Sequence, residues 1–414
     1  MPSVAERRLA VRADFPIFER RVAGKPLVYL DSGATSQKPR VVIDALATHL
    51  AEHNANIHRS VYPLAQEADA AFESARARIA AFTGSDPKTT IFTKNATEAI
   101  NLVARSWGAA HLGPGDAVLI TQMEHHANLV PWQQICRERG AELRYLEVDE
   151  HGELSLAQLD AELARGDVRI VAFAHVSNVL GTINPVAEIA TRARAAGAAT
   201  LVDGAQAVPQ MPVDVEALGV DFYAWTGHKA LGPTGIGVLH GRRELLEAMD
   251  PFLTGGDMIA SVSQEETTWN ELPFKFEAGT PPIAEAVGLG AAVEYLDKLG
   301  MQRVREHERE LTELMLSRLA EVPGVRAVGP PAGRERGALV SFTVEGMHPH
   351  DIAELLGREG VCVRAGHHCA QPLMRCLGVA ATARASLGVY NDESDVEAFV
   401  AALAKGREVF GLDG

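Results

Sequence analysis

The chain has 414 residues, of which 47% are hydrophobic and 22% are charged. This is the composition of an ordinary globular protein, and the length is sufficient for two domains with a large core. The formal net charge of −15 argues against nucleic acid or an anionic membrane as the main partner. No run of about 18 apolar residues is present, so we expect no membrane-spanning segment.

Cysteine usage and the N-terminus point to a reducing compartment. The chain has four cysteines, too few for a disulfide scaffold, and none of them forms a CxxC pair. Cys136 and Cys376 are predicted to be small core residues. Residues 1–8 carry early charge and no apolar stretch, so the sequence predicts no signal peptide. We therefore expect a cytoplasmic protein with reduced thiols.

The N-terminal part of the chain predicts mainly helices. Its elements follow from apolar periodicity and from the residues that begin and end each segment. They are a short helix within residues 1–20, a strand over 27–31, helices over 40–52 and 66–82, a strand over 90–93, and a helix that opens at 95–101.

The middle of the chain alternates apolar strands with helices, which is typical of a parallel sheet with right-handed crossovers. The clearest predicted strands cover residues 117–121, 168–173, 199–202 and 221–226. The segments that follow them carry, in order, His125, Asn178, Asp203 and Lys229. In open α/β sheets, ligands bind outside the carboxyl ends of the strands. One polar residue at a strand end is a weak signal, but these four together predict a site at one edge.

Beyond about residue 290 the pattern changes to a mixture of helices and isolated strands, which indicates a smaller α+β domain. We expect a large α/β domain over residues 24–290 and a small domain made of residues 1–23 and 291–414. The predicted elements are helices over 288–299, 302–319 and 349–357 and from about 394, and strands over 338–344 and 361–364.

Lys229 stands where a buried strand breaks into a glycine-rich turn. A lysine at a strand end is often one that extends its ammonium group into water. The alternative is a Schiff-base lysine that carries pyridoxal phosphate (PLP), because that role requires an amine removed from solvent. Lys229 alone does not decide between the two interpretations.

Three further residues match the needs of the PLP ring. Asp203 can keep the pyridine nitrogen protonated, or it can simply cap a helix. Gln206 can reach the ring hydroxyl. His125 can stack on the ring and move protons, although a lone histidine is more often a core residue with satisfied hydrogen bonds.

A phosphate cradle is predicted near the start of the helix at 95–101. Thr97 lies in its first turn, where backbone N–H groups are free to bind a phosphate. Thr226 and His228 can add side-chain donors. An Asn-x-Thr segment before a helix is equally an ordinary cap.

A second cluster surrounds Cys369, which follows two histidines and stands five residues after Arg364. Positive neighbours lower the pKa of a thiol and favour a nucleophilic thiolate. A metal site at His367, His368 and Cys369 is the weaker alternative, because adjacent residues rarely bind one ion. We therefore predict no metal site.

Arg384 follows a predicted turn near the end of the chain. A guanidinium group can bind a substrate carboxylate through two parallel hydrogen bonds. The alternative for Arg384 is an ion pair on the surface.

Six motifs together resemble the SufS-type (group II) cysteine desulfurases, which are class V aminotransferase-like PLP enzymes. The similarity extends over nearly the whole chain and is far more specific than any one motif. Thr226 stands where many relatives have serine, which keeps the hydroxyl. The motifs are EHHAN at 124–128, DGAQ at 203–206, TGHK at 226–229, FEAGTP at 276–281, RAGHHC at 364–369 and ARAS at 383–386.

The resemblance implies a fold-type I PLP enzyme that acts as a homodimer with shared active sites and converts L-cysteine to L-alanine. It also implies a role for each matching residue. Lys229 would carry the cofactor and move the substrate proton, His125 would stack on the ring, Asp203 and Gln206 would bind the ring nitrogen and oxygen, Thr97, Thr226 and His228 would hold the phosphate with Thr280 of the partner subunit, Asn178 and Arg384 would hold the substrate carboxylate, Cys369 would become a persulfide, and Arg364 would lie near it.

The resemblance further implies a sulfur acceptor of the SufE or SufU type and a role in iron–sulfur cluster assembly. The loop around Cys369 lacks the serine-rich insertion of group I enzymes, which implies group II and a cysteine held close to the substrate. Two alternatives stay open at this point, a selenocysteine lyase with the same site and an aminotransferase on the same fold. Cys369 argues against the aminotransferase, since an aminotransferase has no use for this cysteine.

Overall fold

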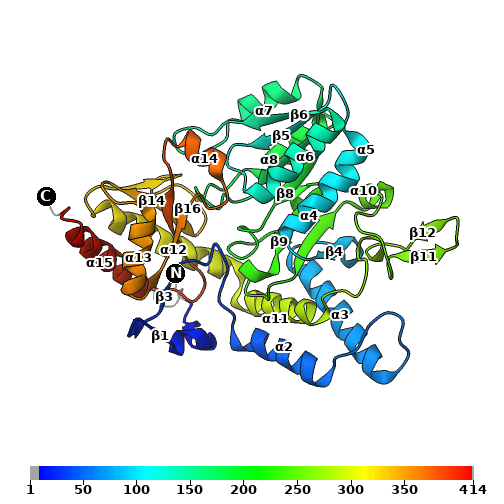
Figure 1. Ribbon diagram of the computed structural model, residues 1–414, viewed down its shortest axis with the longest axis horizontal. Coiled ribbons are helices and arrows are strands. Elements are labelled where there is room, and N and C mark those ends of the chain that lie inside the picture. The colour runs from blue at the N-terminus through cyan, green and yellow to red at the C-terminus, as the bar shows by residue number, and fades with distance from the viewer. Residues whose placement is uncertain (1–8, 413–414) are drawn as a thin grey trace.

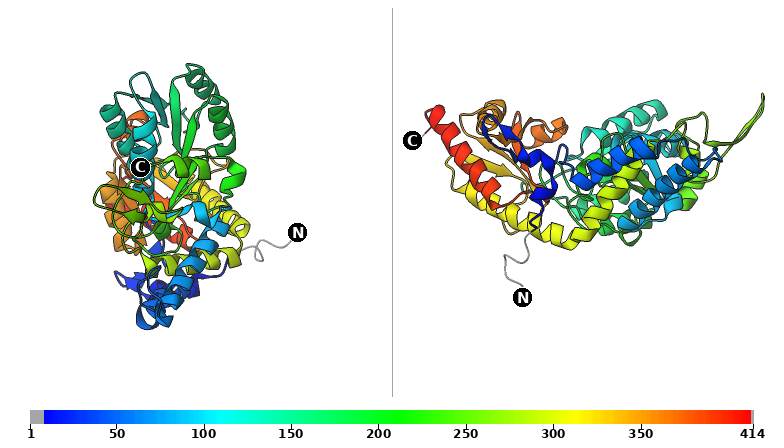
Figure 2. Two further views of the ribbon diagram at one scale, coloured as in Figure 1. Left: turned by 90° about the vertical axis from the view of Figure 1, so that its right-hand side faces the viewer. Right: turned by 90° about the horizontal axis from the view of Figure 1, so that it is seen from below.

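The computed structural model describes residues 9–412 and has two parts of unequal size (Figure 1). The larger part is built on a seven-stranded sheet and the smaller part on a four-stranded sheet. Seen from below, helix α12 (Met301–Ala320) runs along the smaller part toward the larger one, where α11 (Ile283–Leu299) precedes it (Figure 2).

The large sheet has the strand order β4-β10-β9-β8-β7-β5-β6. The five strands β9, β8, β7, β5 and β6 are parallel to one another. Strand β10 is antiparallel to both β9 and β4. This mostly parallel sheet with helical crossovers confirms the predicted fold class. The strands are β4 Thr90–Thr93, β5 Ala117–Thr121, β6 Glu142–Leu146, β7 Val168–Ala174, β8 Ala199–Asp203, β9 Phe222–Thr226 and β10 Gly237–Gly241.

Helices cover both faces of this sheet because its strands are apolar on both sides. Neighbouring residues of one strand enter different cores: Leu119 packs in one and Val118 in the other, as the alternation of a β-strand requires. The first core is closed by α3 (Pro63–Phe82), α8 (Val186–Ala195) and α11, and the second by α4 (Ala96–Val103), α6 (Val130–Arg139) and α10 (Arg243–Ala248).

The smaller part is an antiparallel sheet in the order β13-β14-β17-β16, with its own core around Met315, Phe342 and Phe399. Helices α12, α13 and α15 contribute to this core. Its elements are β13 Val325–Val328, β14 Leu339–Val344, β16 Arg364–Gly366, β17 Thr382–Ser386, α13 Pro349–Arg358 and α15 Glu393–Val409.

The strand predicted over 27–31 is shorter, β3 (Val28–Tyr29), and it pairs in parallel with β15 (Val361–Cys362). Leu30 lies in the core of the smaller part. Residues just beyond the predicted boundary at 24 therefore pack with the C-terminal sheet, and the boundaries at 24 and 291 stay a prediction. The helix predicted within 1–20 is represented by two short 3-10 turns, Arg12–Asp14 and Pro16–Glu19, while residues 1–8 lie outside the described residues.

A hairpin that the sequence did not predict stands away from the body of the large part (Figures 1 and 2). It consists of β11 (Ile259–Val262) and β12 (Thr267–Trp269), and most of its residues are exposed. Between residues 9 and 412, no helix is both long and apolar enough to cross a bilayer. The remaining strands and α-helices are β1 Arg21–Val22, β2 Lys25–Pro26, α2 Arg40–Glu52, α5 Ala109–His111, α7 Leu156–Leu163, α9 Val215–Leu218 and α14 Gln371–Cys376.

Candidate active site

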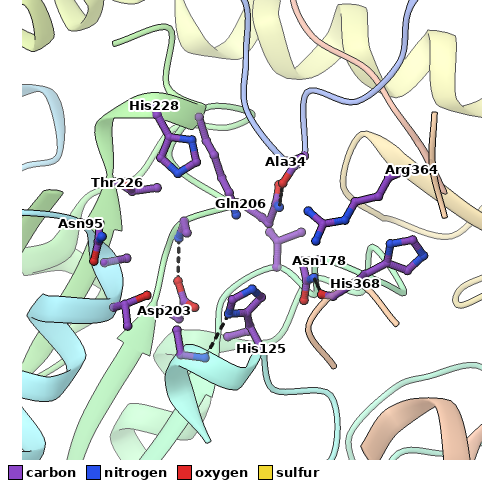
Figure 3. A pocket seen from close by; sticks show the side chains of 18 of the residues that line it. Ala34, Asn95, His125, Asn178, Asp203, Gln206, Thr226, His228, Arg364 and His368 are labelled. Atoms are coloured by element: carbon purple, nitrogen blue, oxygen red, sulfur yellow. Dashed lines mark hydrogen bonds between the residues drawn. The ribbon is translucent and has the colours of Figure 1, made fainter. Parts of the chain in front are cut away.

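A cavity of about 190 Å³ lies at the carboxyl edge of the large sheet, where the smaller part meets it (Figure 3). The strand-exit residues predicted to converge do converge there. Of the predicted site residues, Cys369 and Thr280 are outside the set that lines this cavity. The lining includes Thr97, His125, Asn178, Asp203, Gln206, Thr226, His228, Lys229, Arg364 and Arg384.

The turn after β8 brings Asp203 to the cavity because glycine follows it. A Cβ atom at Gly204 would lie 2.1 Å from Cε1 of Tyr223, so no larger residue fits beside this buried ring. Asp203 Oδ1 accepts a hydrogen bond of 2.9 Å from the Ala205 N–H within a turn, and no helix begins there, so the predicted alternative of a helix cap is wrong. Burial raises the pKa of Asp203, and Lys229 opposes that shift. A positively charged ligand group in the cavity would oppose this shift and stabilise the carboxylate.

Lys229 stands in a 3-10 turn directly after β9, and its remaining exposure opens onto the cavity. Burial lowers its pKa to about 8, with Asp203 opposing this shift and Arg384 reinforcing it. A lysine that extends into bulk water would keep its ordinary pKa. The amine is therefore far easier to deprotonate than that of an exposed lysine, which a nucleophilic role requires.

His125 is held by its own turn. Its Nδ1 accepts a hydrogen bond of 3.1 Å from the Ala127 N–H, which leaves Nε2 to carry the proton of the neutral ring. Burial, followed by the nearby Lys229 charge, lowers the pKa of His125 to about 3. The ring is thus a neutral group on the cavity wall (Figure 3).

The buried carboxyl group of Glu124 stabilises the turn that carries His125. The sequence analysis assigned no role to Glu124. Its carboxyl accepts hydrogen bonds from Thr121 Oγ1 at 2.5 Å, Asn128 Nδ2 at 2.6 Å and the Ala174 N–H at 3.0 Å. Burial raises the pKa of Glu124 to about 8. The only available signal was its place in the EHHAN motif.

At one end of the cavity, the start of a helix lies together with a side-chain hydroxyl and an imidazole ring. Helix α4 begins there, with Asn95 Oδ1 accepting from the Glu98 N–H at 2.9 Å, so the predicted ordinary cap is present. Thr97 lies in the first turn of this helix. Thr226 Oγ1 is buried and has no hydrogen-bond partner among the described residues. The pKa of His228 is lowered to about 4 by burial, so its ring is neutral.

Arg384 lies in β17 and its side chain is only 1% exposed, so the predicted alternative of a surface ion pair is wrong. Its Nη1 donates to the Asn178 carbonyl at 2.9 Å, and its Nη2 lies 3.3 Å from Asp31 Oδ1. Its Nε is buried without a partner among residues 9–412. Arg384 lines the cavity, and a guanidinium group there suits a carboxylate ligand.

Cys369 lies at the edge of the cavity, half-buried, with its Sγ 3.7 Å from Nη2 of Arg364. Cys369 and His368 both have left-handed φ angles, 56° and 52°, a conformation that costs a non-glycine residue about 1–2 kcal/mol. His368 lines the cavity, and its Nδ1 is buried without a partner in the described part of the chain. Sequence reasoning gave His368 no role of its own.

The other predictions for single residues had mixed outcomes. Cys136 is buried as predicted, but Cys376 is exposed, because the short helix α14 buries Leu373 and Met374 instead. Thr280 is exposed and lies before α11. The described residues contain no group of three or more His, Cys, Asp or Glu side chains placed to bind a metal ion.

Comparison with known proteins identifies the family. The family description "Aminotransferase class-V" matches residues 28–399. The chain belongs to this family. The predicted membership of the class-V aminotransferase family is therefore confirmed.

Relatives of this class-V family member carry a more specific name. A cysteine desulfurase of Haloferax volcanii is 49% identical over 415 residues, with 97% of each chain covered. A probable cysteine desulfurase of Halobacterium salinarum is 52% identical over 403 residues, again with 97% of each chain covered.

Solved structures agree with this similarity. The cysteine desulfurase CsdA of Escherichia coli, in an S-sulfonic acid form, has a TM-score of 0.89 and 40% identity, with 99% of both chains covered. A C-DES mutant with glycine covalently linked to its PLP cofactor has a TM-score of 0.82 and 25% identity, covering 95% of this chain and 98% of that one.

The cavity has the chemistry that PLP needs. Lys229 supplies an amine with a lowered pKa, Asp203 a buried carboxyl group and His125 a neutral imidazole ring. The start of helix α4 supplies backbone N–H groups for the phosphate. The unpartnered hydroxyl of Thr226 is a further observation, since a buried hydroxyl without a hydrogen bond costs free energy until a ligand supplies one.

The lowered pKa of Lys229 predicts how the apoprotein captures PLP. Only the unprotonated amine reacts with an aldehyde, so the capture rate should rise with pH and reach half its maximum near pH 8. Rapid-mixing absorbance from pH 6 to 11, with Lys229→Ala as the control, would measure this. A midpoint at the ordinary lysine value of 10.5 would contradict the burial argument.

Proposed function

We propose that this protein is a PLP-dependent cysteine desulfurase that converts L-cysteine to L-alanine and holds the released sulfur as a persulfide on Cys369. The observation that carries the proposal is the thiol of Cys369 beside a cavity that also presents Lys229 and Arg384. An aminotransferase needs the amine and the arginine but has no use for the thiol. The relatives named cysteine desulfurase support the same conclusion.

The proposed roles follow from the positions of the side chains. Arg384 and Asn178 hold the substrate carboxylate, so that its Cα lies near Lys229. PLP, when bound through Lys229, supplies the withdrawal of electrons from Cα. Asp203 would pair with the protonated pyridine nitrogen, Gln206 would bind the ring oxygen, His125 would cover the ring, and Thr97, Thr226 and His228 would hold the phosphate.

Lys229 is the proposed base at Cα, because burial lowers its pKa to about 8 and the unprotonated amine can accept a proton. The thiolate of Cys369 attacks the substrate sulfur, with Arg364 beside it. The S–S bond of the persulfide forms as the C–S bond breaks, and the electron pair of the C–S bond stays with the carbon fragment. That fragment takes up a proton and leaves as alanine, and a thiol later removes the sulfur.

The test is to incubate the purified holoenzyme with L-cysteine and dithiothreitol and to measure alanine and sulfide together. Equal amounts of the two support the proposal. Pyruvate and ammonia in place of alanine would indicate a lyase, and amino transfer to a keto acid without sulfide would indicate an aminotransferase.

A finer part of the proposal is a group II, SufS-type enzyme that passes sulfur to a SufE-like or SufU-like protein for iron–sulfur cluster assembly in the cytoplasm. A half-buried Cys369 on a short loop supports it, because an acceptor thiol must then come to the cavity. Without acceptor, rapid quenching should show a burst of about one alanine per site; an acceptor should raise only the slow phase. Selenocysteine lyase activity is the second candidate, since selenocysteine differs from cysteine only in having selenium in place of sulfur and would fit the same site.

Replacement of Arg384 by lysine tests the carboxylate site. We expect the KM for cysteine to rise about 10- to 100-fold with a smaller change in kcat, because a point charge cannot replace a planar fork. Steady-state kinetics measure both constants. Arg375→Lys, on the exposed side of α14, is the control and should behave as wild type. Unchanged kinetics of Arg384→Lys would exclude the proposed contact.

We also propose a homodimer in which Thr280 reaches the phosphate of the partner subunit. Thr280 is exposed and outside the cavity of its own chain. Large apolar side chains are exposed on α2 and just before α3, the helices that pack on α11, which supports an interface there. These side chains, with the exposed fraction of each residue, are Val41 (48%), Leu50 (59%), Val61 (86%) and Tyr62 (50%).

Complementation tests this arrangement. Lys229→Ala and Thr280→Val chains, co-expressed with different tags, should form hybrid dimers with one complete site if Thr280 acts in the partner's site. The mixture should then reach roughly a quarter of wild-type alanine formation, far above the two parents. Activity no higher than the sum of the parents would mean that Thr280 acts within its own chain or not at all.

A further inference from the structure

The loop that carries Cys369 is held in an unfavourable backbone conformation. Two successive residues that are not glycine, His368 and Cys369, have φ angles of 52° and 56°. Such residues adopt the left-handed region only where the surrounding structure imposes it, and they concentrate at functional sites. The contacts that impose it here therefore control where the thiol lies.

Two loops from the large sheet make these contacts. The His126 N–H donates to the carbonyl of Cys369 at 2.7 Å, and the Gln371 N–H donates to the His126 ring at Nε2, at 3.1 Å. His126 thus bonds to the chain at Cys369 and again two residues after it. On the other side, Asn178 Nδ2 donates to the His368 carbonyl at 2.7 Å, as Figure 3 shows.

The ring of His126 must be neutral to do this, because Nε2 is the acceptor of a backbone N–H. Its surroundings favour that state: burial lowers its pKa, and the neighbouring His367 lowers it further. The other histidine of the EHHAN motif, His125, points its ring into the cavity and accepts a hydrogen bond from the Ala127 N–H. The two adjacent histidines therefore have different surroundings and different bonds.

We infer that His126 is a positioning residue for Cys369: its ring fixes the strained loop so that the thiol stays beside the cavity and Arg364. This inference rests on the proposed function, in which Cys369 is the nucleophile. Without the Nε2 acceptor, residues 368–371 lose one of their bonds to the large sheet and can relax. The thiol would then spend less time at the distance required for attack, and small displacements of a reacting group reduce rates strongly.

In the proposed function, the residues that hold the cofactor and the substrate carboxylate, among them Lys229 and Arg384, lie outside residues 368–371, so relaxation of this loop should leave cysteine binding intact. In His126→Ala we expect the alanine burst to slow about tenfold, with KM and the cofactor absorbance near those of wild type. Alkylation of Cys369 by iodoacetamide, followed by peptide mass spectrometry, should become several-fold faster, since the loop opens more often.

His126→Gln is the decisive second variant, because its side-chain oxygen can accept the Gln371 N–H and cannot be protonated in this pH range. It should restore both the burst rate and the slow alkylation. His367→Ala, an exposed histidine of the same loop, should match wild type in both measurements. A burst as fast in His126→Ala as in wild type, or as slow in His126→Gln as in His126→Ala, would overturn the inference.

These outcomes are distinct from a failure of the proposed function. If wild-type enzyme forms no alanine from cysteine, the proposed function itself fails. If wild type forms alanine and the alanine burst depends on Cys369 but not on the acceptor at position 126, only the role of His126 is excluded.

Discussion

Replacement of Lys229 by alanine is expected to reduce alanine formation from cysteine on the order of 1,000-fold, which corresponds to about 4 kcal/mol of activation free energy. The variant loses both the covalent attachment of PLP and the base at Cα. It should also lack the yellow absorbance of the bound cofactor after gel filtration. Borohydride treatment of the wild-type holoenzyme, followed by peptide mass spectrometry, should place the pyridoxyl group on Lys229.

Lys38 is the appropriate control, since burial lowers its pKa to about 7 and it lies near the same turn. Its Nζ donates to the carbonyls of Ser36 at 2.6 Å and of His228 at 2.8 Å, and it does not line the cavity. A lowered pKa without access to the cavity should not produce a labelled lysine. A pyridoxyl group found on Lys38, or none on Lys229, would contradict the assignment.

The sequence predicted the large sheet well because its strands are buried on both faces. Segments such as β5 (Ala117–Thr121) and β7 (Val168–Ala174) are continuous apolar runs, which are recognisable without any partner. The edge strand β6 (Glu142–Leu146) was not assigned individually, because charged residues alternate with apolar ones in it. The exposed hairpin β11–β12 was missed for the same reason: no buried face marks it.

Pairing between distant segments is the second limit. The strand at Val28–Tyr29 is visible in the sequence, but its pairing with Val361–Cys362 depends on how the two parts of the chain meet. Local pattern carries no information about such a partner. The same applies to Arg384, whose short Ala-Arg-Ala-Ser segment looks like the end of a turn and is in fact the buried strand β17.

The candidate site was predictable to the extent that it depends on strand exits. Asp203 and Lys229 lie at the same edge because parallel strands end there. Glu124 and His368 were not assigned because their importance comes from burial and hydrogen bonding. The three donors to Glu124 come from the last residue of β5, from the turn that follows it and from the last residue of β7, and only the folded chain brings them together.

Replacement of Cys369 by serine should reduce alanine formation from cysteine by at least about 100-fold, because a serine hydroxyl is not ionised near neutral pH and cannot accept the sulfur. The cofactor absorbance and the binding of cysteine should persist, since neither depends on the thiol. Cys376→Ser, an exposed cysteine seven residues later on α14, is the matched control and should keep wild-type activity.

Selenocysteine provides the second arm of this experiment. The carbon–selenium bond is weaker than the carbon–sulfur bond, so selenium should leave with less help from a nucleophile at position 369. Cys369→Ser should therefore lose much less activity on selenocysteine than on cysteine, measured as alanine formed from each substrate under the same conditions. Equal loss on both substrates would indicate that Cys369 is needed for the shape of the cavity edge. Undiminished activity on cysteine would exclude the persulfide altogether, and with it the proposed route of sulfur out of this site.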